Sequence, residues 1–86
     1  MKYSIKISKN AITDLKKIPK IYQKKIDQKI LTLADEPRPE GVKKLKGTND
    51  LYRIRISDYR IIYKIRDNEL LILIVKIGHR KNVYGK

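Results

Sequence analysis

The sequence predicts an α+β fold: an N-terminal strand, a helical hairpin, and then an antiparallel sheet of three or four strands. Three observations support this. Apolar and polar residues alternate at the start of the chain, apolar residues then recur at helical spacing, and β-rich segments separated by turn signals follow. With 86 residues, the chain should form a single domain, residues 1–86, around one modest core.

The N-terminal half is predicted to form one strand and two helices. Residues 3–7 alternate as a half-buried strand does. Ser8 follows as an N-cap, and Pro19 ends the first helix and opens the second. The first helix places one apolar stripe on Ala11, Ile12, Leu15 and Ile18. The second runs from about Lys20 to Asp35, with an apolar face made of Tyr22, Ile26, Ile30, Leu33 and Ala34.

The C-terminal half is predicted to be a β-meander. Residues 36–41 contain two prolines and a glycine, so they form a connector, and residues 42–47 follow as a short edge strand. The turn Ser57-Asp58 joins two further strands. Residues 70–75 are apolar on both faces, which is typical of a central strand. The helices should cover one face of the sheet and leave the other for function.

Arginines gather on one face of the predicted hairpin. Alternation places Arg53 and Arg55 on the face opposite to the apolar side chains of their strand. A two-residue turn then puts Arg55 directly opposite Arg60. Like charges opposed in this way destabilise a sheet by roughly 0.2 to 1 kcal/mol. Stability gives no reason for such a pair, whereas a bound phosphate does.

The charge of the chain indicates a polyanionic partner. It has 22 Lys and Arg against 9 Asp and Glu, a formal net charge of +13 and a pI near 10.1. These values are typical of proteins that bind nucleic acid or a ribonucleoprotein. An acidic protein partner or an anionic membrane surface would also match the charge.

Composition also excludes several classes of site. The absence of cysteine excludes disulfides, thiolate zinc sites and a cysteine nucleophile, and suits a reducing cytosol. No apolar run approaches the ~20 residues of a membrane span, and residues 1–7 lack the long apolar stretch of a signal peptide, so we expect a cytoplasmic protein without a membrane partner. The carboxylates are scattered and there is one histidine, so we expect no metal and no cofactor.

The arginines suit cleavage of RNA by its own 2′-hydroxyl. That reaction needs a base, donors for the charge on phosphorus, and an acid. Arginine binds phosphate through two parallel hydrogen bonds and stays charged, so the candidate stabilisers are Arg53, Arg55, Arg60 and Arg80. Candidates for proton transfer are Tyr84, whose phenol pKa falls among cations, His79, and nearby lysines. Plainer interpretations are a packing tyrosine, a surface histidine and a solvated arginine face.

The ordered motifs resemble the RelE/ParE superfamily of bacterial and archaeal toxin-antitoxin toxins. They are residues 11–15, Pro37-Arg38-Pro39, residues 44–47, 51–56 and 58–63, then Gly78-His79-Arg80 and Tyr84. The resemblance implies a fold akin to small microbial ribonucleases and cleavage of messenger RNA in the ribosomal A site. It assigns the active positions of RelE-type members to Arg53, Arg55, Arg60, Arg80 and Tyr84. We expect RNA or ribosome contacts from Lys43, Lys44, Lys46, Lys64 and Lys81.

The chain departs from the family in its proton-transfer group. The paired strand positions are often lysines in relatives, whereas here they are Arg53 and Arg55, and arginine stays charged at neutral pH and releases no proton there. Proton transfer then falls to Tyr84, His79 or Lys46, and His79 matches the histidine that some relatives use. The resemblance also implies a RelB-like antitoxin whose acidic or amphipathic segment wraps the toxin. Alternatives are a ParE-like inhibitor of DNA gyrase and a non-catalytic module that binds RNA or a protein partner.

Overall fold

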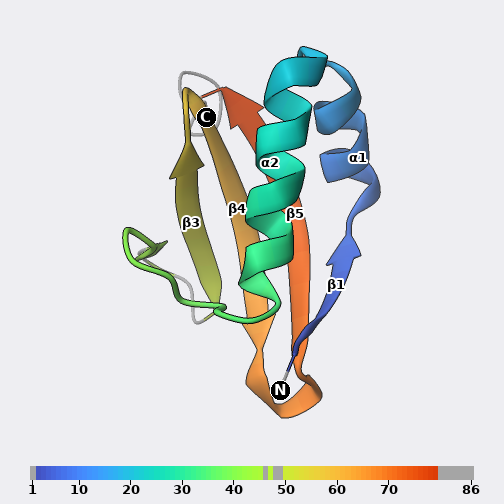
Figure 1. Cartoon of the computed structure of the whole chain (residues 1–86). Coiled ribbons are helices and arrows are strands. Elements are labelled where there is room, and N and C mark those ends of the chain that lie inside the picture. The colour runs from blue at the N-terminus through green and yellow to red at the C-terminus, as the bar shows by residue number, and fades with distance from the viewer. Residues whose placement is uncertain (1, 46, 48–49, 80–86) are drawn as a thin grey trace.

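The computed structural model describes residues 2–45, 47 and 50–79, in which two helices lie against one face of a five-stranded sheet (Figure 1). The elements are β1 (Ser4–Ile7), α1 (Lys9–Lys16), α2 (Lys20–Leu33), β2 (Lys43–Lys44), β3 (Leu51–Ile56), β4 (Tyr59–Arg66), the 3₁₀ turn η1 (Asp67–Glu69) and β5 (Leu71–His79). The predicted α+β class is confirmed. Neither helix of the described ranges has the length and apolarity needed to cross a membrane.

The sheet has the strand order β1-β5-β4-β3-β2. Strands β2 to β5 form the predicted antiparallel meander, with the two-residue β2 at its edge. Strand β1 adds a fifth strand, which lies parallel to β5 with Ile5 opposite Ile72. Alternation predicted that β1 is a strand but did not predict its neighbour, because a side-chain pattern marks faces and not partners. Strand β5 is therefore an interior strand between β1 and β4, which explains why its first half is apolar on both faces.

The hairpin between β3 and β4 has the predicted register. Ile56 lies opposite Tyr59, and Arg55 lies directly opposite Arg60. The turn is short enough for this because Ser57 adopts a left-handed conformation with φ of 52°. The opposed arginine pair that was inferred from spacing is thus present in the sheet.

Helix α1 covers the part of the β5 edge that β1 does not reach. Ser8 caps the helix by accepting a hydrogen bond from the Ala11 amide at 3.1 Å, and its hydroxyl donates to the Val75 carbonyl at 2.8 Å. Asp14 accepts from the Ile77 amide at 3.2 Å. Because Ala11 and Asp14 face the sheet, Ile12 turns outward and is 42% exposed. Its predicted place on the buried stripe was wrong.

The core lies between the helices and one face of the sheet. Its fully buried members include Ala11, Ile26, Leu33, Ile61, Tyr63, Ile72 and Ile74. The ladder between β4 and β5 shifts register next to Ile62, where Val75 is an extra residue in β5. A bulge of this kind reverses the alternation of the side chains that follow it. Ile74 and Ile77 therefore both face the core although they are three residues apart.

Candidate nucleic-acid interface

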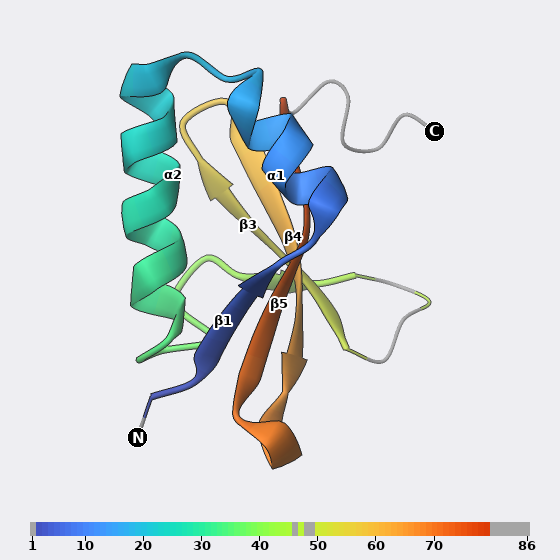
Figure 2. The same cartoon turned by 90° about the vertical axis from the view of Figure 1, so that its right-hand side faces the viewer.

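Both helices lie on one side of the sheet (Figure 2), and the opposite face carries several basic residues. Arg53 lies opposite Lys43 on one side and Ile62 on the other, and Arg60 lies between Arg55 and Gly78. Directly opposed residues of neighbouring strands share a face. All nine acidic residues of the chain lie in helices, turns or connectors and none in a strand. The strands therefore contribute positive charge and no negative charge to this face.

Four of these cations surround one cleft. The cleft has a volume of about 280 Å³ and is lined by Gly41, Lys43, Arg53, Arg55 and Arg60. Arg53 and Arg60 are half-buried, whereas Arg55 and Lys43 are exposed. Partial burial lowers the local dielectric constant and strengthens attraction to an anion. Three guanidinium groups and one ammonium around a small hollow give it the chemistry of a phosphate site.

His79 lies on the other face of the sheet. Its Cα pairs with Tyr59, and its ring meets the Tyr59 ring edge-on with centroids 5.6 Å apart. Both contribute to a second cleft, with Asp14 and Lys17. The residue of β5 opposite Arg60 is Gly78. The structure therefore places His79 on the face opposite to Arg53, Arg55 and Arg60.

Of the lysines predicted to contact RNA or the ribosome, those that the structure describes also lie on different faces of the sheet. Lys43 lines the cleft, and the half-buried Lys64 shares its face, opposite Leu51 and Leu73. Lys44 is exposed and lies opposite Tyr52, on the helix side of the sheet. The other predicted site residues, Lys46, Arg80, Lys81 and Tyr84, lie outside the described residues.

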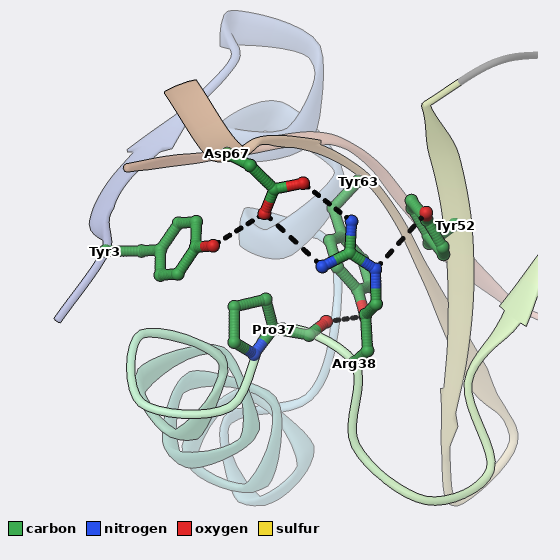
Figure 3. A network of polar contacts seen from close by, with 6 residues as sticks. All are labelled: Tyr3, Pro37, Arg38, Tyr52, Tyr63 and Asp67. Atoms are coloured by element: carbon green, nitrogen blue, oxygen red, sulfur yellow. Dashed lines mark hydrogen bonds and ion pairs between the residues drawn. The ribbon is translucent and has the colours of Figure 1, made fainter. Parts of the chain in front are cut away.

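A polar network that sequence reasoning missed joins the connector before β2 to the sheet (Figure 3). The two terminal nitrogens of Arg38 donate to the two carboxylate oxygens of Asp67, at 2.9 and 3.3 Å. The Arg38 guanidinium also lies over the Tyr52 ring, 5.3 Å from its centroid. Tyr3 donates to Asp67 at 2.6 Å. The one local sign of this network in the sequence was an arginine between two prolines, and the partner of Arg38, Asp67, lies 29 residues away in the sequence.

Tyr63 also holds this connector. Its hydroxyl donates to the Pro37 carbonyl at 2.8 Å, and its ring stacks on that of Tyr52 with centroids 6.1 Å apart. Burial raises the pKa of Tyr63 well above its usual range, so the phenol stays protonated and remains a donor. The connector is thus attached to both β3 and β4.

The network also shifts the pKa of Asp67. Hydrogen bonds from Arg38, and then from Tyr3, favour its charged form and hold the pKa of the carboxyl below its usual range. The bond to Asp67 raises the pKa of Tyr3. A group whose pKa is depressed in the folded state stabilises the fold above its unfolded pKa, about 3.9 for aspartate, and this stabilisation disappears as the pH falls through the folded value.

We therefore expect the effect of Asp67→Asn on stability to depend on pH. At pH 7 the variant should be less stable than the parent chain, because the charged bond to Arg38 is lost. The difference should shrink below pH 4, where the parent carboxyl also becomes protonated. Urea unfolding at a series of pH values measures it. A difference that stays constant from pH 7 to pH 2 would contradict the role of Asp67.

Comparison with known proteins agrees with this fold. The profile of the family described as the ParE toxin of the type II toxin-antitoxin system parDE matches residues 5–84. The chain belongs to the RelE/ParE toxin superfamily. RelE1 of Methanocaldococcus jannaschii is 36% identical over 98% of this chain and 97% of its own length. A RelE-like protein of Escherichia coli is 30% identical over 94% of this chain and 86% of its own length.

Solved structures of RelE proteins share the fold of this superfamily member. The toxin in the archaeal RelE-RelB complex from Pyrococcus horikoshii superposes with a TM-score of 0.84 at 35% identity, covering 96% of this chain and all of the other. A doubly substituted mutant of Escherichia coli RelE in the free state gives 0.82 at 22% identity, over 96% of this chain and 88% of the other. That second similarity supports the fold alone.

Proposed function

We propose that this RelE-like toxin is an endoribonuclease that cuts messenger RNA in the ribosomal A site without a metal ion. The observation that carries the proposal is the cleft in which Lys43, Arg53, Arg55 and Arg60 converge. Its opposed pair, Arg55 and Arg60, destabilises an empty sheet and is relieved by a bound phosphate. Family membership supports the toxin role, and the basic cleft supports the nuclease branch over the branch that poisons gyrase.

The proposed reaction is an in-line transfer at phosphorus. The 2′-oxygen of one nucleotide forms a bond to the adjacent phosphorus while its proton passes to a base. The bond from phosphorus to the 5′-oxygen of the next nucleotide breaks, and that oxygen receives a proton from an acid. The products are a 2′,3′-cyclic phosphate and a 5′-hydroxyl. Arg53, Arg55 and Arg60 stabilise the negative charge that grows on the phosphoryl oxygens, and the ribosome positions the message.

Arg53 and Arg55 cannot transfer protons near neutral pH, so Tyr84 is the proposed proton-transfer residue. We expect Tyr84→Phe, which keeps the ring, to slow single-turnover cleavage on the ribosome by about tenfold or more, as general acid-base groups do, with little change in ribosome affinity. His79→Ala is the control, since His79 lies on the helix side of the sheet, and it should have less effect. If Tyr84→Phe cuts at the parent rate and His79→Ala is inactive, His79 is the proton-transfer residue and Tyr84 is not.

We also propose that a RelB-like antitoxin inhibits this protein. The Pyrococcus horikoshii relative was solved as a complex with RelB. A net charge of +13 favours rapid association with an acidic segment. Such a segment would neutralise the same arginines that bind RNA, so occupancy by the antitoxin and by the message should exclude each other.

Induced expression in a bacterium, with mapping of message 5′ ends, tests the function. The proposal expects growth arrest through loss of translation, with new 5′ ends inside translated codons. Expression of an R53A/R60A variant in place of the parent chain should leave messages intact. Growth arrest with intact messages and gyrase-linked DNA breaks would show a ParE-like activity instead.

A further inference from the structure

The basic cleft is built from two parts that are held in place differently. Arg53, Arg55 and Arg60 lie on the central strands β3 and β4, which pair along their length. Gly41 and Lys43 come from the connector and from β2. Strand β2 pairs with β3 through two residues only among those described, and the Leu45 amide adds a hydrogen bond to the Leu51 carbonyl at 3.0 Å. So short a ladder is weakly held by itself.

The other support of this wall is the network around Arg38. Pro37 and Arg38 are held on the helix side by Tyr63 and Asp67. From there the chain turns through a hydrogen bond from the Val42 amide to the Pro39 carbonyl at 3.1 Å, and Gly41 adopts a φ of 90° that favours glycine. Lys43 follows five residues after Arg38. The backbone that carries Gly41 and Lys43 therefore continues directly from the segment that the network holds.

We propose that Arg38 is a positioning residue, which through Asp67 holds Gly41 and Lys43 as the wall of the basic cleft. The inference rests on the proposed binding of RNA in that cleft. Arg38 itself lies on the helix side, over Tyr52, and acts through the connector. The Arg38–Asp67 pair is about half exposed, so its contribution should be modest and should decrease as salt increases.

The sign of one substitution separates positioning from simple electrostatics. Asp67→Asn removes a negative charge, so electrostatics alone predicts tighter binding of RNA. Positioning predicts weaker binding, because the wall loses its anchor. Glu69→Gln is the matched control: it removes the same charge two residues away, where Glu69 contacts only the exposed Arg66, at 3.6 Å, among the ion pairs of the described chain.

The binding experiment uses a single-stranded RNA oligonucleotide with 2′-O-methyl riboses, which lacks the attacking hydroxyl. Fluorescence anisotropy at low salt should show that Asp67→Asn weakens binding by about 1.5-fold to 5-fold, the range of an exposed ion pair, while Glu69→Gln binds as well as the parent or better. In a Lys43→Ala background, Asp67→Asn should cause no further loss, since both act on one wall. Equal RNA affinity of Asp67→Asn and Glu69→Gln overturns the proposal. So does an Asp67→Asn change that lowers the affinity as much in the Lys43→Ala background as in the parent chain, and so does a parent chain that does not bind the oligonucleotide.

Amide hydrogen exchange gives a second measurement that needs no RNA. In Asp67→Asn the exchange rate of the Leu45 amide should rise by a larger factor, relative to Glu69→Gln, than the rates of the β4 and β5 amides, which follow the modest global loss of stability. Unchanged exchange at Leu45 contradicts the anchoring role, and a rise at Leu45 no larger than that throughout β4 and β5 contradicts it too, because it shows a general loss of stability and no local one. Hydrogen exchange does not depend on cleavage. A chain that does not cut messages would therefore refute the proposed nuclease, while the exchange rates would still test the anchoring role of Arg38 and Asp67.

Discussion

Arg60→Ala should lower single-turnover cleavage of ribosome-bound message by about 10²-fold to 10³-fold, as loss of one transition-state donor typically does. Arg60 is half-buried in the cleft and faces Arg55 across the sheet. Its charge should act most strongly when extra charge develops on the phosphoryl oxygens, so the rate constant should fall more than the affinity. Quench-flow cleavage on programmed ribosomes measures both.

Arg66→Ala is the matched control for this change. Arg66 lies at the other end of β4, on the same face, and is exposed beside Glu69. It should cut at nearly the parent rate. Thermal melts should place both variants close to the parent chain, because Arg60→Ala also removes a like-charge contact. If Arg60→Ala cuts at the parent rate, Arg60 is not a transition-state donor. If the variant is unfolded, its loss of cleavage does not support assigning Arg60 to the site.

Arg55→Glu should make the protein more stable and inactive. The substitution replaces an opposed pair of like charges by a pair of opposite charges, which should stabilise the sheet by about 1 kcal/mol and raise the melting temperature by about 4 to 8 °C. The same carboxylate would repel the phosphate, so cleavage should fall by at least the ~10²-fold expected for a lost donor. Calorimetry and the ribosomal cleavage assay measure the two effects on the same samples.

Lys24→Glu is the control for this charge reversal. Lys24 lies exposed on α2, so the change lowers the net charge of the chain by the same two units without touching the cleft. It should leave cleavage nearly unchanged apart from a small loss of ribosome affinity. If Arg55→Glu were no more stable than the parent, the opposed pair would carry no strain, and the argument that a phosphate relieves it would fail.

Local sequence patterns predicted the arginine face well, because each pattern involves residues that are only a few positions apart in the sequence. Period-two alternation assigned Arg53 and Arg55 to one face, and a two-residue turn fixed the register that opposes Arg55 to Arg60. Ser8 was predicted as an N-cap because a cap hydrogen bond spans three residues. Each of these features depends on residues that are close together in the sequence.

The features that were missed depend on distant residues or on a single irregularity. Nothing local indicates that β1 pairs with β5 or that Arg38 binds Asp67. The position of His79 shows the effect of an irregularity. In a regular β5 with Ile72 and Ile74 facing the core, the His79 side chain would lie on the same face as the arginines. The extra residue at Val75 reverses the alternation of side chains along the strand and places His79 beside Tyr59.

The chemistry of the cut ends tests the proposed activity most directly. Purified protein would be added to ribosomes programmed with a defined message, with and without EDTA at a level that leaves the ribosome intact, and the fragments analysed by mass spectrometry. We predict a 2′,3′-cyclic phosphate and a 5′-hydroxyl at a cut in the A-site codon, and no cut when the attacking nucleotide carries a 2′-deoxy sugar. Fragments with 5′-phosphate ends, a cut that survives the 2′-deoxy substitution, or an intact message would contradict cleavage by the 2′-hydroxyl in this arginine cleft.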